Sequence, residues 1–480
     1  MNLLASNQEN LINFWESDAW GFITIIAVLV CSLIVANVLK KSVKFLEKSL
    51  IPTSVLGGMI LLIISFVYTI IKGQNPDGTW ENIFNLDFFG GNGLRALYII
   101  AYHGLAIGFI ASTFKPQTGK FNRKRTAEVF NTGVTTVATY LLQGVLGMGI
   151  TILLGTFVMK DLFKASGLIL PFGYGQGTGQ ALNWGTAWEN RTQAPIFEGG
   201  ANFGLTVAAL GFLSASIGGV IHLNIMKKKG RLKHINVEST AVDASQILEK
   251  NETPFVESID KMSIQLGFVF GTYVIAYVLM WALSKAIPSM TPTIYGFNFL
   301  FGVLGAVLVK NILKGLKKCG AVKKEYINGF LMDRICGFAF DLMIVAGFAA
   351  IELQLLVDYW HVLLIMGVVG AVSTYFYNAF VAKKLFPTYA DEQFMAMYGM
   401  LTGTASTGMM LLREVDDGTS LSQENLVYQN LPAIVFGFPI MLLAAIAPEK
   451  PLEVCLILLG FFVVLNIILF RSFIFKRKKK

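Results

Sequence analysis

The chain has 480 residues, 54% of them hydrophobic and only 14% charged, and its mean hydropathy is +0.60. Soluble globular proteins carry about a quarter charged residues, so this composition excludes an ordinary soluble domain and predicts an all-α polytopic membrane protein. The net charge of +9 is clustered in loops and at the C-terminus, which indicates membrane topology rather than nucleic-acid binding.

Apolar windows recur along the whole chain, and crossing about 30 Å of hydrocarbon as a helix takes roughly 20 residues. Five windows lie in the first half, at Trp20–Leu39, Val55–Ile71, Leu94–Phe114, Thr126–Val158 and Asn202–Met226. Five lie in the second half, at Ser263–Leu283, Tyr295–Leu313, Ile327–Ile351, His361–Val381 and Leu431–Ala447. A further window, Leu452–Phe470, precedes the basic end of the chain, so eleven spans are predicted.

Between the fourth and fifth windows lies a glycine-rich stretch, Leu170–Arg191, which also carries Gln176, Gln180 and Asn183. Glycine lets the backbone leave helical geometry, and at membrane depth this is tolerated only inside protein or beside a water-filled cavity. A helix from Leu162 to the first glycines would rise roughly 18 Å, about half a bilayer. We therefore expect a re-entrant hairpin over residues 162–191, with its tip near the midplane.

Loop charges orient the windows. Basic clusters follow the first, third and fifth windows, at Lys40–Lys48, Lys115–Arg125 and Lys227–Lys233, whereas the alternate loops are neutral or acidic. Basic loops stay in the cytoplasm, so the N-terminus is predicted outside, the first hairpin enters from outside, and the C-terminus with Lys476–Lys480 is cytoplasmic. Residues 227–262 form a polar linker, which we expect to be a central cytoplasmic loop.

A second interrupted stretch, Tyr398–Gly408, lies between the fourth and fifth windows of the second half. Aligned with Tyr174–Ala181, it agrees at five of eight positions with a constant offset (398 − 174 = 224). This predicts an inverted repeat of two five-helix halves, residues 1–226 and 263–447, with a second re-entrant hairpin at 386–413. Residues 448–480 add an extra helix and a basic tail.

The chain shows no nucleotide-binding loop, zinc-binding helix motif or nucleophile elbow, so we do not expect an enzyme. We expect the second half-helices to begin near Thr178–Gln180 and Gly403–Ala405, where free N–H groups could hold a carboxylate. The residues expected to bind substrate are Gln176, Gly177, Thr178, Gly179, Gln180, Gly403, Thr404, Ala405, Ser406 and Arg413. Those expected to supply oxygen to sodium are Gly173, Gly175, Asn183, Asp341, Gly399, Thr402 and Thr407. The alternative for the glycines is close helix packing, which we expect to be the only role of Gly104–Gly108 and Gly200–Gly204.

An aspartate, an arginine and two tryptophans could have a structural role instead of a role in binding. Asp341 lies inside the eighth window and either coordinates a cation or solute or pairs with Arg95 or Arg334. Arg413 either snorkels or pairs with a substrate carboxylate. Trp184 and Trp188 are expected to be interfacial anchors.

From about Val55 to Ala447 the chain resembles the sodium/glutamate symporter family. Gly175–Gly179 is similar to that family's Gly-Gly-His-Gly-Thr-Gly hairpin tip, with Tyr174 in place of the first glycine and Gln176 in place of the histidine. In the second stretch Gly399, Gly403 and Thr407 fit the family pattern, whereas Leu401 stands at an expected glycine and Ser406 at an expected proline.

The resemblance implies sodium as coupling ion, L-glutamate as substrate, and a homodimer in the cytoplasmic membrane whose hairpin-bearing domain moves against a scaffold. It offers no counterpart for Leu452–Lys480. The alternatives are a sodium- or proton-coupled carrier of another small organic anion, such as a di- or tricarboxylate, or an anion channel.

Overall fold

The computed structural model describes residues 14–75, 80–115, 123–191, 193–231, 259–321, 324–416 and 421–471. The longer helices are α1 (Ser17–Ser42), α3 (Thr53–Lys72), α4 (Gly93–Phe114), α5 (Arg123–Phe157), α7 (Gly200–Lys228), α9 (Lys261–Ala286), α11 (Asn298–Lys318), α12 (Gly329–Ala349), α13 (Leu353–Leu385) and α18 (Pro451–Leu469). The shorter ones are α2 (Lys44–Glu47), α6 (Ile169–Glu189), α10 (Thr291–Gly296), α14 (Ala390–Thr402), α15 (Ala405–Arg413), α16 (Ser422–Tyr428) and α17 (Asn430–Ile446). Most of the predicted central loop (232–258) and the basic tail (472–480) lie outside the described residues.

Among the described residues, nine helices are long and apolar enough to cross a membrane: α1, α3, α4, α5, α7, α9, α11, α13 and α18. The chain is thus an all-α polytopic membrane protein, as its composition predicts. Two of the eleven predicted windows do not meet this standard. Helix α12 carries Asp333, Arg334 and Asp341 within its 21 residues, and α17 is apolar but has only 17 residues.

Large apolar side chains are exposed along the outer faces of these helices, among them Ile71 on α3 (78% exposed) and Phe376 on α13 (68%). A soluble protein would bury such residues, whereas hydrocarbon solvates them without cost. The exposed faces therefore mark the surface that meets lipid.

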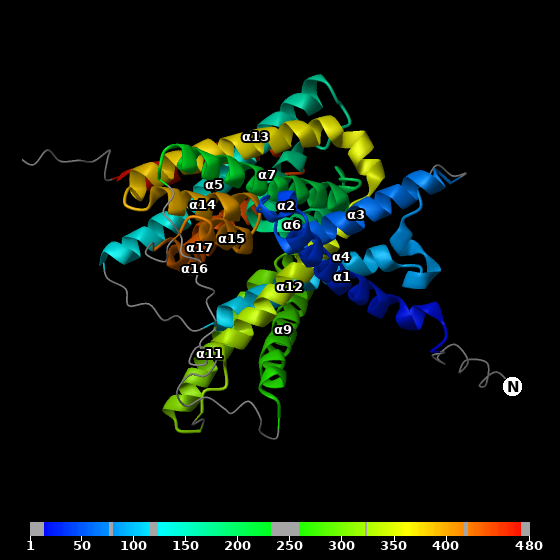
Figure 1. The fold of residues 1–480 in the computed structure, drawn as a ribbon, viewed down its shortest axis with the longest axis horizontal. Helices are drawn as coiled ribbons and strands as arrows, with labels where there is room; N and C mark the ends of the chain where they lie inside the picture. The colour runs from blue at the N-terminus through cyan, green and yellow to red at the C-terminus, as the bar shows by residue number, and fades with distance from the viewer. Residues whose placement is uncertain are drawn as a thin grey trace, which may run out of the picture.

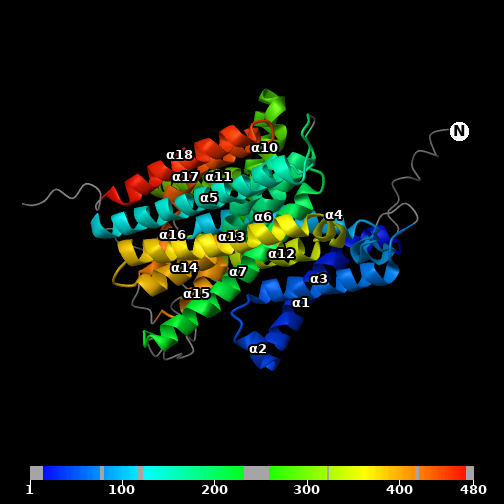
Figure 2. The same ribbon diagram turned by 90° about the horizontal axis from the view of Figure 1, so that it is seen from above.

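The helices fall into two groups. Figure 1 shows α9, α11 and α12 projecting away from the group that contains α5, α13 and α14. In Figure 2, α18 lies along α5, with which it makes extensive contact. The start of α1 and the end of α18 lie at opposite ends of the long axis in both views. Helix α6 lies among these elements, packed mainly against α7, with further contacts to α5, α4 and α12.

Candidate functional site

Helix α6 is broken at Gly177, whose backbone has φ 78° and ψ −169°. Side chains other than glycine rarely adopt this conformation, so the glycine is what permits the break. The break divides α6 into two arms, and the second begins at Thr178, within the range predicted from the sequence.

The two arms of α6 fold back on each other. The ring of Phe163, just before the first arm, stacks on Phe197 beyond the second arm, at 4.7 Å between ring centroids. Nearer the break, Phe172 of the first arm stacks on Trp184 of the second at 5.5 Å. The prediction of interfacial tryptophans is wrong: Trp184 and Trp188 are each 2% exposed, because these aromatic rings fill the interior of the hairpin. We call residues 164–189 the first hairpin.

The second break separates α14 from α15 at Gly403 and Thr404, again where the sequence predicts it. The two helices pack against each other because neither Gly399 nor Gly408 has a side chain. A Cβ atom on Gly408 would lie 2.4 Å from the carbonyl oxygen of Ala396. We call residues 390–413 the second hairpin.

The two breaks meet in the interior. A Cβ atom on Gly177 would lie 2.9 Å from Cγ2 of Thr404 and 3.6 Å from the carbonyl oxygen of Gly403. Phe212 of α7 touches both breaks. Segments more than 200 residues apart in sequence thus form one site, which contains most of the residues predicted to bind substrate.

Helix α5 caps the first arm of each hairpin. The hydroxyl of Tyr140 donates to the carbonyl oxygen of Gly175 at 3.1 Å, and Nε2 of Gln143 donates to the carbonyl oxygen of Leu401 at 2.9 Å. The Gly175 carbonyl therefore already accepts one hydrogen bond, from Tyr140, and its second lone pair is what could still meet sodium, so this ligand stays a prediction. Sequence reasoning missed both capping residues, since each looks like an ordinary polar position on a long apolar helix.

Gln143 also belongs to a buried set of four uncharged polar side chains, together with Thr139 on α5 and Thr374 and Asn378 on α13. Gln143 donates to the Thr374 hydroxyl at 2.9 Å, and Asn378 contacts Thr139 at 3.4 Å. All four are at most 1% exposed, yet Oε1 of Gln143 and Oδ1 of Asn378 have no hydrogen-bond partner among the residues that the structure describes. Buried polar atoms usually have a hydrogen-bond partner, so these two oxygens are candidate acceptors for a cation.

The second arm of the first hairpin is polar and buried. The Thr178 hydroxyl donates to the carbonyl oxygen of Met343 at 3.3 Å, and Nδ2 of Asn183 donates to the carbonyl oxygen of Gly296 at 3.2 Å. Within the described part of the chain, neither amide atom of Gln180 nor Oδ1 of Asn183 has a hydrogen-bond partner. By contrast, Ala405 and Ser406 at the start of α15 are exposed, Thr404 is half-buried, and Gln176 is half-buried.

Several predicted sodium ligands have packing or local bonding roles. A Cβ atom on Gly173 would lie 2.8 Å from Val207, and one on Gly179, which is predicted to bind substrate, would lie 2.8 Å from Met343. Gly399 lies three residues before the end of α14, and Thr402 donates to the carbonyl oxygen of Tyr398 at 2.7 Å. The buried Thr407 hydroxyl lies 3.4 Å from that of Thr404. The packing role expected of Gly104–Gly108 and Gly200–Gly204 is confirmed, since Cβ atoms at all four glycines would lie 3.0 Å or less from neighbouring atoms.

Asp341 and Arg413 are the two charged residues predicted for the site. The Asp341 carboxyl interacts with the Ser54 hydroxyl at the start of α3, and no ion pair of Asp341 is present among the described residues. Arg413 is exposed at the far end of α15, nine residues and about 13 Å of helical rise beyond Thr404. The structure therefore does not bring Arg413 to the site. Asp341 lies two residues before Met343, whose carbonyl oxygen accepts from Thr178, and its role as a cation ligand stays a prediction.

A charged cluster holds the base of the second hairpin. Asp391, in the first turn of α14, accepts from Nε2 of His222 at 3.2 Å and pairs with Arg231 at 2.8 Å, and Nδ1 of His222 contacts the Tyr375 hydroxyl at 2.9 Å. Burial raises the pKa of Asp391, but the hydrogen bond from His222 and the charge of Arg231 outweigh it, so the pKa lies below its ordinary value. The cluster ties α14 to the end of α7.

The two aligned tyrosines converge on one residue. Tyr174 Oη lies 3.0 Å from the Ser214 hydroxyl, and Tyr398 Oη donates to the Ser214 carbonyl at 3.0 Å. The breaks, however, are offset by 403 − 177 = 226 residues, whereas the aligned motifs are offset by 224. Aligning the two motifs therefore pairs the two tyrosines correctly, but it does not pair the two breaks, which differ from the alignment by two residues.

Compared with known proteins, the chain matches no protein-family model and no curated protein. Among the described residues, no group of three or more histidine, cysteine or acidic side chains could hold a metal ion. The resemblance of the two glycine-rich stretches stays an expectation drawn from those stretches alone.

Proposed function

We propose that the chain is a secondary active transporter that couples sodium entry to uptake of L-glutamate across the cytoplasmic membrane by alternating access. The observation that carries this proposal is the meeting of the two helix breaks at Gly177 and Thr404, inside a bundle of apolar helices. Broken helices with converging ends are how secondary transporters build solute sites in the membrane.

The proposed topology is an inverted repeat with two re-entrant hairpins, the N-terminus outside and the C-terminus in the cytoplasm. It is supported by the positions of the hairpin bases along α7. Glu189 at the base of the first hairpin accepts from the Gly199 and Ala201 N–H groups at the start of α7. Asp391 at the base of the second is bound by His222 and Arg231 at the other end of α7. Hairpins based at opposite ends of one spanning helix fit entry from opposite sides.

Substrate carboxylates would bind at the starts of the second arms, Thr178–Gln180 and Ala405–Thr407. The Thr404 side chain makes no capping hydrogen bond to α15, so the helix N–H groups there have no competing side-chain acceptor. Sodium would bind to neutral oxygens. To the predicted ligands Asn183, Thr402 and Thr407 we add Oε1 of Gln143 and Oδ1 of Asn378, two acceptors of the buried polar set that adjoins the second hairpin through the Gln143–Leu401 hydrogen bond.

Labelled glutamate uptake into proteoliposomes, with and without an inward sodium gradient, tests the proposal. We expect accumulation above equilibrium only with the gradient. Equilibration without accumulation would overturn the symporter and favour a channel. Competition by malate, citrate and aspartate tests the substrate: stronger inhibition by citrate or malate than by unlabelled glutamate would reassign the protein to the di- and tricarboxylate carriers.

A further inference from the structure

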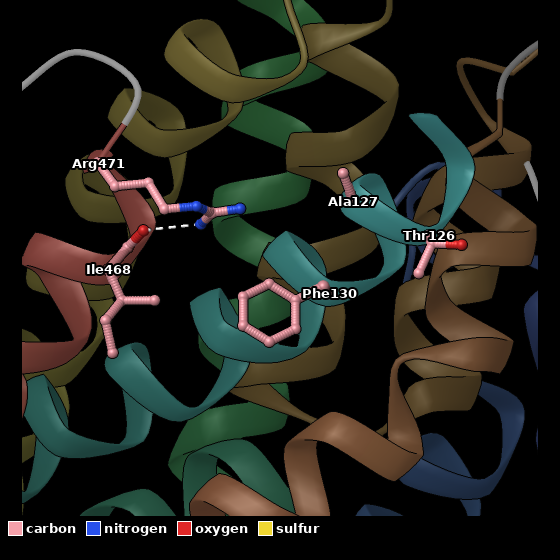
Figure 3. Close-up of a pocket in the computed structure, with 5 residues that line it drawn as sticks. All are labelled: Thr126, Ala127, Phe130, Ile468 and Arg471. Carbon is pink, nitrogen blue, oxygen red and sulfur yellow. Dashed lines mark hydrogen bonds between the residues drawn. The ribbon is translucent and has the colours of Figure 1, made fainter. Parts of the chain in front are cut away.

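A surface cleft lies far from the helix breaks, between the start of α5 and the end of α18 (Figure 3). It has a volume of about 510 Å³ and is lined by Thr126, Ala127, Phe130, Ile468 and Arg471. Most of this lining is apolar, and Arg471 is its one charged residue. An apolar cleft with a single guanidinium suits a ligand that is apolar along its length and anionic at one end.

Arg471 is held in place at the mouth of this cleft. Its guanidinium lies over the ring of Phe130, 5.5 Å from the ring centroid, and Nη1 donates to the carbonyl oxygen of Ile468 at 2.7 Å. In the described part of the chain, no acidic side chain pairs with Arg471. A guanidinium has five N–H donors in a planar fork that matches phosphate oxygens, so a positioned arginine retains donors for a phosphate group.

The position of the cleft fits the membrane surface. Helix α18 has 19 apolar-rich residues, which rise about 28 Å and match the hydrocarbon thickness. Arg471 follows two residues after its end, at headgroup level, and the sequence beyond contains Lys476–Lys480. By the positive-inside rule this is the cytoplasmic leaflet, whose anionic lipids attract basic residues near the surface.

We propose that this cleft binds an anionic phospholipid, with the phosphate on Arg471 and an acyl chain along Phe130 and Ile468. The site is distinct from the proposed transport site and does not depend on which solute is carried. The family resemblance offers no counterpart for α18. In this proposal, the end of α18 and the start of α5 together bind the lipid.

Native mass spectrometry of the full chain in a zwitterionic detergent, titrated with phosphatidylglycerol or phosphatidylcholine, tests the proposal. We expect tighter binding of phosphatidylglycerol. Arg471→Gln should weaken that binding about 5-fold, the effect of roughly 1 kcal/mol for one basic residue at a membrane surface. Ala127→Trp should weaken it too, because it fills the cleft without changing charge. Arg334→Gln is the matched control, since Arg334 also stacks on a phenylalanine, Phe330, at 4.9 Å but lies on α12 outside the cleft.

The proposal is overturned if phosphatidylglycerol is not preferred, if Arg334→Gln weakens binding as much as Arg471→Gln does, or if inorganic phosphate displaces the lipid. Monodispersity and melting temperature confirm that each variant is folded. Should Arg471→Gln fail to fold, Ala127→Trp decides the matter, and unchanged phosphatidylglycerol binding in that variant would refute the assignment.

Discussion

The two hairpins meet at their tips but are fixed to the protein in different ways. The first is buried or half-buried along nearly its whole length and packs through glycines onto the backbones of its neighbours. A Cβ atom on Gly167 would lie 2.1 Å from the carbonyl group of Gly147 in α5, and one on Gly185 would lie 2.1 Å from the carbonyl oxygen of Gly200 in α7. The second hairpin has a glycine contact inside itself, between Gly399 and Gly408, and one such contact with α7, where a Cβ atom on Gly211 would lie 2.6 Å from the carbonyl oxygen of Thr402.

Exposure differs at the start of the second arms, whereas the first arm of the second hairpin is buried from Glu392 to Thr402. Thr178 and Gln180 in the first hairpin are at most 1% exposed, whereas Ala405 and Ser406 in the second are open to the surface. Backbone-to-backbone contact leaves no room for movement, while side-chain contact can be remade in another register. The first hairpin has more such backbone contacts and is therefore part of a rigid core, and we predict that solute reaches the site past the second hairpin.

The largest predicted effect is at Gly185. Gly185→Ala would push a methyl group into the backbone of Gly200, so we expect it to lower the free energy of unfolding by about 3 kcal/mol or more. Gly408→Ala should cost less, because the second hairpin can open to relieve its internal clash, but it should reduce uptake. Thermal unfolding in detergent measures the first effect. Gly149→Ala in α5 is the control, because no atom lies within 4 Å of its added methyl group. Equal melting temperatures for Gly149→Ala and Gly185→Ala would contradict the interpretation that the first hairpin is part of a rigid core.

The positions of the helix breaks could be predicted from the sequence because glycine is the residue that permits them. Gly177 and Gly403 lie in short stretches of glycine and polar residues between apolar segments. A lipid-facing helix does not carry such a stretch, because its backbone groups would meet hydrocarbon. The class of fold could likewise be predicted from the length and spacing of the apolar windows.

The partners of the breaks could not be predicted. Tyr140 and Gln143 cap different hairpins from adjacent turns of α5, and only the packing of α5, α13 and α14 reveals which carbonyl each one meets. Trp184 and Trp188 have the composition of interfacial anchors, but burial depends on Phe163, Phe172 and Phe197, which come from three separate segments. Such contacts are set by tertiary structure and leave no local signal.

Gln143→Leu should have the next largest effect. It leaves the carbonyl oxygen of Leu401 and the hydroxyl of Thr374 without their shared donor, at a cost of about 2 kcal/mol, and removes a proposed sodium ligand. We expect a weaker dependence of uptake on sodium as well as lower stability. Tyr140→Phe is the matched change at the first hairpin: it removes the bond to Gly175 but none of the proposed sodium ligands. A Gln143→Leu protein with unchanged sodium dependence would remove Gln143 from the proposed cation site.

Water access distinguishes the hairpins directly. In a background lacking Cys31, Cys319, Cys336 and Cys455, Ser406→Cys should react with a water-soluble maleimide about tenfold faster or more than Thr178→Cys, because the 0%-exposed position 178 reacts only after local opening. Reaction rates followed by mass spectrometry measure this ratio. Saturating glutamate should slow the reaction at position 406. Similar rates at the two positions would mean that the second hairpin is no more open than the first.

The smallest predicted effect is at the base of the second hairpin. Asp391→Asn removes the charge that pairs with Arg231 and His222, and we expect it to lower stability by about 1 kcal/mol at neutral pH, a value reduced by partial exposure of the pair. Because the pKa of Asp391 is lowered in the folded state, its contribution is present above the unfolded pKa of about 3.9 and is lost as pH falls through the folded value. Melting temperatures of the wild type and the variant should therefore differ at pH 7 and converge below about pH 4. Asp333→Asn is the control, because its ion pair with Lys115 is more exposed and should contribute little. A difference that persists unchanged at low pH would show that Asp391 acts through packing and not through its charge.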